Sequence, residues 1–279
     1  MSQAAAFFDL DRTMMAGSSG MHFARAAFRT GMVGRAQLAK WGVEHLRFRL
    51  RGSTDERTAQ VLSQVRELLS GVPERAVARM TPELLAGVLP RIYPRMLAEV
   101  HAHQDAGRPT FIVSAASNGL VELLARVLDM EGGIGTRYQV DGDGRLTGEL
   151  NGPFIYGKGK VKAMQDFAQA HDIDLADSWA YSDSASDLPM LRAVGNPVVV
   201  NPDGDLAEIA ARQGWRVMRF ERLGRSLAIF GATAVAAAVG GTGRRLLARR
   251  RAAPGRTRRL ATAPRRPAAG RLRALPRRR

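Results

Sequence analysis

The sequence predicts an α/β protein with three layers, in which helices cover both faces of a mostly parallel sheet, with an α-helical module inserted after the first strand. Two observations predict this fold class. Short apolar runs alternate with helical segments over residues 107–220, as is typical of parallel βαβ units. Residues 14–106 instead show apolar residues at three- and four-residue spacing, which indicates helices.

The individual elements follow from local patterns. The apolar run 4–8, ending at Asp9, has the character of a buried strand. Glycine and proline interrupt the helical insert, most clearly at Gly71-Val72-Pro73. The later strands are expected at 108–114, 136–140, 145–150, 178–182, 197–200 and 215–218, with a hairpin around Asp141-Gly142-Asp143-Gly144. The later helices are expected at 120–130, 157–170, 185–193 and 205–213.

Composition limits the possible chemistry. The chain has 279 residues, of which 45% are hydrophobic, enough for a substantial core in one large or two modest domains. It contains no cysteine, which excludes disulfides, thiolate metal ligands and cysteine nucleophiles. The N-terminus lacks a basic region followed by a long apolar run, so we expect no secretory signal and a cytoplasmic location.

The net charge of +16 is concentrated in a C-terminal tail. Residues 244–279 contain 15 arginines and no acidic residue, so residues 1–243 carry a net charge of only about +1. We expect this tail, which is dominated by Arg, Ala, Pro and Gly, to be disordered. The basic charge therefore says little about what the folded body binds.

An apolar segment at residues 221–243 precedes the tail. Its run 226–241 is about 16 residues long, whereas a spanning helix needs roughly 20. A packed helix, an interfacial helix and a marginal membrane segment are all open for it. Two partner hypotheses follow, contact of 226–279 with an anionic membrane and binding of nucleic acid by 244–279. The sequence predicts no oligomeric state.

Polar side chains stand at the ends of the predicted strands and at the start of one helix. They are Asp9 and Asp11 after the first strand, Ser114 after the second, Lys160 at the helix start, and Asp183 and Asp187 after the strand 178–182. A parallel sheet brings the carboxyl ends of its strands to one edge, where ligands bind. Two carboxylates in one crevice repel, so a cation or a shared proton is expected between Asp9 and Asp11. Taken alone, this pair also fits an Asp-rich turn.

Together these pieces resemble the haloacid dehalogenase superfamily of phosphohydrolases, and within it the phosphoserine-phosphatase-like branch of subfamily IB hydrolases. The matching pieces are Phe8-Asp9-Leu10-Asp11-Arg12-Thr13, Val113-Ser114-Ala115, Gly159-Lys160 and Tyr181-Ser182-Asp183-Ser184-Ala185-Ser186-Asp187-Leu188-Pro189-Met190. Each motif is weak by itself, but their order and their placement at strand ends are specific. The resemblance covers residues 4–220. It implies a Rossmann-like catalytic core from residues 1–13 and 107–220 and a helical cap from residues 14–106.

The resemblance also implies an activity, that of a Mg²⁺-dependent phosphomonoester hydrolase acting on a small phosphorylated metabolite through an aspartyl-phosphate. Asp9 would be the nucleophile and Asp11 the general acid and base. A metal ion and a lysine can neutralise the phosphoryl oxygens while a carboxylate attacks. The implied Mg²⁺ ligands are Asp9, Asp183 and the backbone carbonyl of Asp11, with Asp187 binding a metal water or orienting Lys160.

The phosphoryl group would be bound by Ser114 and a lysine. Ser114 also fits a plain polar residue between a strand and a helix. Lys158, Lys160 and Lys162 compete for the second role. Lys160 directly follows Gly159 and precedes Asp183 by 23 residues, as in the family, so we assign the role to Lys160. Lys158 is the alternative, and Lys162 is expected to face solvent.

The loop after the first motif departs from the family pattern. Phosphoserine phosphatases have an acidic residue there that helps to hold the amino acid, whereas this loop reads Ala16-Gly17-Ser18-Ser19. The sequence therefore favours another small phosphomonoester, with a phosphoserine phosphatase proper as the alternative. Ser18 is a candidate substrate contact, and Ser18 or Ser19 is expected to cap the next helix. A non-catalytic protein that binds polyanions or a membrane through its tail is the alternative from another class.

Overall fold

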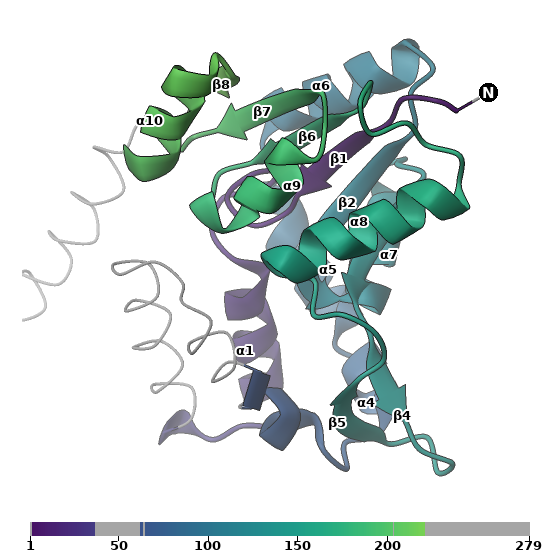
Figure 1. Ribbon diagram of the computed structural model, residues 1–279. Helices are drawn as coiled ribbons and strands as arrows, with labels where there is room; N and C mark the ends of the chain where they lie inside the picture. The colour runs from purple at the N-terminus through teal and green to yellow at the C-terminus, as the bar shows by residue number, and fades with distance from the viewer. Residues whose placement is uncertain (1, 37–61, 64, 203, 221–279) are drawn as a thin grey trace, which may run out of the picture. The chain divides into compact units, whose positions relative to one another are not determined.

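The computed structural model describes residues 2–36, 62–63, 65–202 and 204–220, and Figure 1 shows their arrangement. The apolar segment 221–243 and the tail 244–279 lie outside the described residues, so the hypotheses on them stay predictions. None of the helices in the described ranges combines the length and the apolar character needed to cross a bilayer.

A six-stranded sheet with the order β3-β2-β1-β6-β7-β8 forms the centre of the described fold, and all of its neighbouring strands are parallel. Its strands are β1 (Ala6–Asp9), β2 (Thr110–Ser117), β3 (Gly132–Thr136), β6 (Trp179–Ser182), β7 (Asn196–Val200) and β8 (Arg216–Met218). β1 is buried along its whole length, and its Phe8 pairs with Ile112 on one side and Tyr181 on the other. The carboxyl ends of β2 and β6 therefore flank the end of β1.

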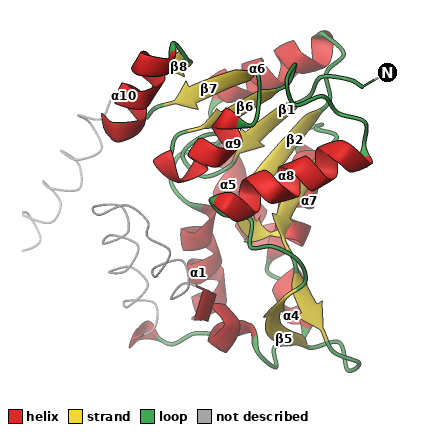
Figure 2. Cartoon of the chain, in the orientation of Figure 1, coloured by secondary structure: helices red, strands yellow, loops and turns green. Residues whose placement is uncertain are grey.

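Helices cover both faces of this sheet, as Figure 2 shows. One face packs against α6 (Pro94–Asp105) and α7 (Asn118–Val127), and the other against α8 (Lys158–Ala170), α9 (Leu188–Arg192) and α10 (Gly204–Gln213). β1 contributes to both cores because successive strand residues point to opposite faces, with Phe8 in the first cluster and Phe7 in the second. The predicted three-layer α/β/α fold is confirmed.

The insert after β1 is helical in its described part, as predicted. It contains α1 (Ser19–Arg29), α4 (Glu74–Ala78), α5 (Thr81–Val88) and the short 3₁₀ helix η1 (Leu89–Arg91). A third apolar cluster joins α1 to α5 through Ala26, Ala27 and Leu84. Residues 37–61 and residue 64 of the expected cap lie outside the described ranges.

Two segments differ from the domain boundaries that the sequence suggested. α6, expected in the cap, buries Met96 and Val100 against the sheet, because its apolar face covers β1 and β2. The hairpin β4 (Tyr138–Val140) and β5 (Leu146–Leu150), expected in the core, exchanges backbone hydrogen bonds between Leu146 and the 71–72 segment of the insert. We therefore propose that the core takes in α6 and that the cap takes in the hairpin.

The sequence analysis missed β3, an edge strand that contains three glycines. A Cβ atom at Gly133 would lie 2.6 Å from Val121 Cγ1, and one at Gly135 would lie 2.6 Å from Asn118 Cα. Helix α7 thus packs so closely on β3 that a side chain is excluded at these two positions. Glycine is unfavourable in strands, so a segment with three glycines does not show the pattern by which strands are predicted. The close packing requires these glycines, and they are the reason why the sequence does not predict β3.

Candidate active site

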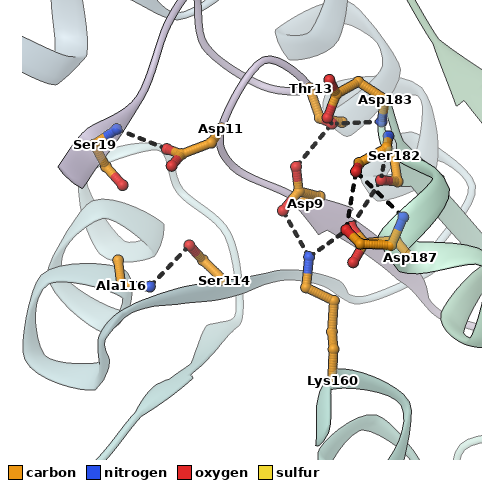
Figure 3. A network of polar contacts seen from close by, with 12 residues as sticks. Asp9, Asp11, Thr13, Ser19, Ser114, Ala116, Lys160, Ser182, Asp183 and Asp187 are labelled. Atoms are coloured by element: carbon orange, nitrogen blue, oxygen red, sulfur yellow. Dashed lines mark hydrogen bonds and ion pairs between the residues drawn. The ribbon is translucent and has the colours of Figure 1, made fainter. Parts of the chain in front are cut away.

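The candidate site lies where β1 and β6 end side by side. Asp9 is the last residue of β1, and Asp183 directly follows β6. Ser114 lies in β2, one residue after the Val113 that pairs with Asp9. The parallel sheet therefore brings these predicted residues to one edge (Figure 3). Helix α8 adds Lys160, and the 3₁₀ helix η2 (Ala185–Asp187) before α9 adds Asp187.

Lys160 joins two buried carboxylates. Its Nζ donates hydrogen bonds to Asp9 Oδ1 at 2.6 Å and to Asp187 Oδ2 at 2.8 Å, and the lysine side chain is only 3% exposed. Desolvation lowers the pKa of Lys160, but Asp187 and Asp9 outweigh it and the net shift is upward. The ammonium is therefore charged at neutral pH.

The glycine before Lys160 has a steric reason. A Cβ atom at Gly159 would lie 1.9 Å from the carbonyl oxygen of Phe154, so only glycine lets the start of α8 approach the preceding loop. Lys162, two residues further along α8, is exposed and pairs with Asp166 at 3.0 Å. The Gly-Lys spacing thus selects the one of these two lysines that faces Asp9.

Thr13 connects the ends of the two strands, a role that the sequence analysis did not assign. Its Oγ1 donates to Asp9 Oδ2 at 2.9 Å and accepts the backbone N–H of Asp183 at 3.0 Å. Asp183 Oδ1 also lies 3.5 Å from Thr13 Oγ1. The hydroxyl has only one proton to donate, and it donates this proton to Asp9, the nearer acceptor. Ser182, also not assigned, donates its hydroxyl to Asp187 Oδ2 at 2.7 Å.

Arg12 is the cation beside Asp183. Its Nη2 lies 2.9 Å from Asp183 Oδ2, although this buried oxygen accepts no hydrogen bond of good geometry from the described residues. The contact is therefore an ion pair rather than a directed hydrogen bond. Arg12 has a φ of 64°, a left-handed conformation that costs a residue with a side chain roughly 1–2 kcal/mol.

The three acids outnumber the cations among them. Asp9, Asp183 and Asp187 face Lys160 and Arg12. Burial raises the pKa of Asp9 to about 6, with Lys160 opposing the rise. Burial raises the pKa of Asp183 to about 8, and the neighbouring Asp9 adds to the rise while Arg12 opposes it. Without a further cation, the protein therefore disfavours the simultaneous ionisation of Asp9 and Asp183.

These residues fit a divalent cation with oxygen ligands. Asp183 Oδ2 is a buried acceptor without a hydrogen bond among the described residues. The Thr13 hydroxyl lies near both the Asp9 and the Asp183 carboxylates, so the two acids are close to each other. Within the described ranges, no three acidic or histidine side chains already converge on one point. A site with two carboxylates matches Mg²⁺, which binds few carboxylates and keeps several waters.

Asp11 points away from Asp9, although the sequence analysis placed both carboxylates in one crevice. β1 ends at Asp9 and the chain turns at Leu10, so the strand alternation does not extend to Asp11. Its Oδ1 accepts the backbone N–H of Ser19 at 2.7 Å, at the start of α1, and its Oδ2 accepts the Ser18 hydroxyl at 3.1 Å. Figure 3 shows Asp11 directed toward Ser19 and away from Lys160.

The cap expected from Ser18 or Ser19 does not form. Ser18 stands at the N-cap of α1 but uses its hydroxyl for Asp11. The Asp11 carboxylate instead takes the first free N–H of α1, which favours negative charge at this end of the helix. Ser18 thus contacts a site residue.

Ser114 is buried beside Asp9, with 3% of its surface exposed. Its Oγ accepts the backbone N–H of Ala116 at 3.2 Å, and its hydroxyl proton has no acceptor within the described ranges. Ser114 can therefore donate that proton to an anionic oxygen beside it.

Comparison with known proteins identifies the family. The model of the haloacid dehalogenase-like hydrolases matches residues 6–192. A probable phosphatase of Mycobacterium tuberculosis is 34% identical over 222 residues, which cover 79% of this chain and 77% of the relative. Phosphoserine phosphatase SerB1 of the same species is 32% identical over 259 residues, which cover 89% and 81%.

A solved structure carries the same fold. It is a protein of unknown function from Bordetella pertussis Tohama I, which aligns with a TM-score of 0.68 at 29% identity over 78% of this chain and 99% of its own. The family match, these relatives and the strand-end site agree with one another. The chain belongs to the haloacid dehalogenase-like hydrolases and is a phosphatase of that family.

Proposed function

We propose that the enzyme hydrolyses a small phosphomonoester through a phosphorylated Asp9 and uses Mg²⁺. The observation that carries the proposal is the contact of Lys160 Nζ with Asp9 Oδ1, at 2.6 Å, in a buried site. A lysine held against a carboxylate can neutralise a phosphate as it approaches that carboxylate, so that one anion can attack another.

The proposed reaction has two steps. In the first, a carboxylate oxygen of Asp9 forms a bond to phosphorus, the bond from phosphorus to the leaving oxygen breaks, and Asp11 donates a proton to that oxygen. In the second, Asp11 takes a proton from a water molecule that attacks phosphorus, and Asp9 is released with inorganic phosphate. Because Asp11 faces α1 here, its side chain has to rotate to reach the leaving oxygen.

The other residues bind and orient. Lys160 and Ser114 would hold phosphoryl oxygens, and Asp187 keeps the Lys160 ammonium in place through its 2.8 Å contact. Asp9, Asp183 and the backbone carbonyl of Asp11 would hold Mg²⁺. When bound, that ion supplies charge neutralisation at a phosphoryl oxygen. Thr13 fixes the mutual position of the two carboxylates.

The test is release of inorganic phosphate from a panel of small phosphomonoesters, with and without Mg²⁺. We expect Mg²⁺-dependent release by the wild type and none by Asp9→Asn. Asp166→Asn removes an exposed carboxylate whose partner among the described residues is Lys162, so it is the matched control and should keep wild-type activity. Acid-quenched protein should retain radiolabelled phosphate in a hydroxylamine-sensitive form. Unchanged activity of Asp9→Asn would refute the proposal.

Phosphoserine is the second candidate substrate. The 32% identity to a phosphoserine phosphatase favours it. The loop after Asp11 argues against it, since residues 16–19 carry no acid to bind the substrate amine and Ser18 is engaged by Asp11. Including phosphoserine in the same panel separates the two, because a phosphoserine phosphatase should prefer it over phosphomonoesters that lack an amino group.

A further inference from the structure

We propose that Arg12 is a built-in counter-ion for Asp183, which neutralises this carboxylate while no divalent cation is bound and releases it, by moving its guanidinium into solvent, when a cation binds. The inference rests on the cation site of the proposed function. It adds a competitor for that site supplied by the chain itself.

The first argument is the way in which the two cations are divided among the three buried acids. Lys160 bonds Asp9 and Asp187, and Arg12 Nη2 lies 2.9 Å from Asp183 Oδ2. Arg12 is thus the cation in direct contact with Asp183 among the described residues. Asp183 is the acid that a divalent cation would share with Asp9, so Arg12 and that cation need the same oxygen.

The quality of the contact carries the second step. Asp183 Oδ2 accepts no hydrogen bond of good geometry from the described residues, so the guanidinium holds it by charge alone. A guanidinium otherwise makes strong, bidentate bonds to carboxylates. A contact that uses one nitrogen and lacks alignment is easily exchanged for metal coordination.

The difference in burial carries the third step. The Arg12 side chain is 41% exposed, whereas that of Asp183 is 4% exposed. The Arg12 guanidinium can therefore move into solvent, while Asp183 stays buried. Once Arg12 has moved away, the Asp183 carboxylate needs another positive charge beside it. The exchange thus moves one side chain and leaves the carboxylate in place.

The backbone at Arg12 carries the fourth step. Its φ of 64° is a conformation that glycine adopts freely and that a long side chain rarely does. An arginine that occupies this turn despite the local backbone preference points to a role for its side chain.

Direct cation binding tests the proposal without a substrate. Titration calorimetry with Mn²⁺ or Mg²⁺ on the purified full chain should show tighter binding by Arg12→Gln than by wild type, on the order of tenfold. Arg25→Gln is the matched control, since it removes the same charge from an exposed arginine on α1 without a contact to Asp183. Its affinity should stay within about twofold of wild type. Equal or weaker binding by Arg12→Gln would overturn the proposal.

Thermal unfolding supplies a second readout. In EDTA, Arg12→Gln should unfold at a lower temperature than wild type, because Asp183 is left buried without a counter-ion. In saturating Mg²⁺ the difference should vanish or reverse. Arg12→Lys keeps the charge and should resemble wild type in EDTA. A loss of stability that is the same in EDTA and in Mg²⁺ indicates a purely structural role and overturns the proposal.

One further variant separates this inference from the proposed function. Asp183→Asn should abolish cation binding if Asp183 is a ligand. If Asp183→Asn binds the cation as wild type does, Asp183 is not a ligand of the cation. The assignment of the cation site and the proposed role of Arg12 are then both refuted. If Asp183→Asn fails to bind and Arg12→Gln binds as wild type does, the role of Arg12 alone is wrong.

Discussion

The candidate site has two halves that are held in different ways. The buried half consists of Asp9, Lys160 and Asp187, and the outer half consists of Asp11, Arg12 and the loop 16–19. In the buried half, Lys160 is 3% exposed and bonds both carboxylates at 2.6 and 2.8 Å. In the outer half, Arg12 is 41% exposed and Asp11 bonds the start of α1. Two acids two residues apart thus have different surroundings.

The difference follows from the elements that carry each half. Asp9 ends a strand that is paired on both sides, so its direction is fixed by the sheet. Asp11 lies in a turn whose next residue has a left-handed backbone, and its partners belong to the insert. We infer that the buried half holds the proposed nucleophile in place, whereas the outer half carries the proposed acid and base and controls cation entry and substrate choice.

Among the variants that compare the two halves, Lys160→Ala has the largest expected combined effect on activity and stability. Phosphatase activity should fall on the order of 10³-fold, because the charge beside Asp9 is lost. The free energy of unfolding should also fall by about 3–5 kcal/mol, since Asp9 and Asp187 are left buried and unpaired. Urea unfolding and phosphate release measure the two effects. Lys162→Ala, at an exposed lysine on the same helix, should change neither, and a comparable loss there would contradict the assignment.

Asp11→Asn should come next, with activity reduced about 10²–10⁴-fold, the usual contribution of a general acid and base. The amide oxygen can still accept the Ser19 N–H, so the free energy of unfolding should stay close to that of wild type. Rate and urea unfolding are measured on the same preparation. If stability falls while activity persists, Asp11 serves the start of α1 and not the reaction.

The aromatic layer beneath the buried half gives a pH-dependent prediction. Phe8, before Asp9, stacks on Tyr181, and the Tyr181 hydroxyl lies 2.9 Å from His103 Nε2. Burial lowers the pKa of His103 to about 4, with Arg108 adding to the effect. Its ordinary pKa is 6.5, so between pH 6.5 and 4 the unfolded chain takes up a proton that the folded chain refuses. Stability from this group is therefore present above pH 6.5 and lost as the pH falls to 4.

His103→Gln should remove this dependence. The difference in free energy of unfolding between wild type and variant should shrink by about 2 kcal/mol from pH 7 to pH 4, a figure discounted for solvent screening. Taking the difference cancels the site acids, whose raised pKa values act in the opposite direction. His101→Gln, at an exposed histidine on the same helix, is the control and should give a constant difference. A constant difference for His103→Gln would show that the ring is not held neutral.

The smallest expected effect is that of Ser18→Ala. It removes the 3.1 Å bond to Asp11 Oδ2 but leaves the 2.7 Å bond from the Ser19 N–H to Oδ1. A neutral donor of this kind contributes on the order of 1 kcal/mol, so kcat/KM should fall by less than tenfold. Steady-state kinetics on the preferred substrate measure it. A change in the ranking of substrates would instead assign Ser18 to substrate recognition.

Sequence reasoning performed unevenly along the fold. It predicted the alternating strands and helices from β6 onward, because short apolar runs bounded by Gly, Pro and Asp are distinctive. It missed β3, whose glycines are there for the close packing of α7. It also assigned α6 to the insert, because a helix that covers a sheet and a helix within a cap share the same periodicity.

For the site, the residue types and their order were enough to select Asp9, Ser114, Lys160, Asp183 and Asp187, and the structure places them together. Thr13 and Ser182 were missed because a single hydroxyl carries no spacing signal, and the bonds that define their roles reach across two strands or a turn.

By itself, the sequence determined that two acids follow the first strand and that a Gly-Lys pair opens a helix, since these are local patterns. Only the tertiary structure decided that Asp9 faces Lys160, that Asp11 faces α1 and that Arg12 stands against Asp183. The physical reason is that contact and burial between residues as far apart as 12 and 183 arise from the packing of the sheet, and these set the charge balance on which the proposed chemistry depends.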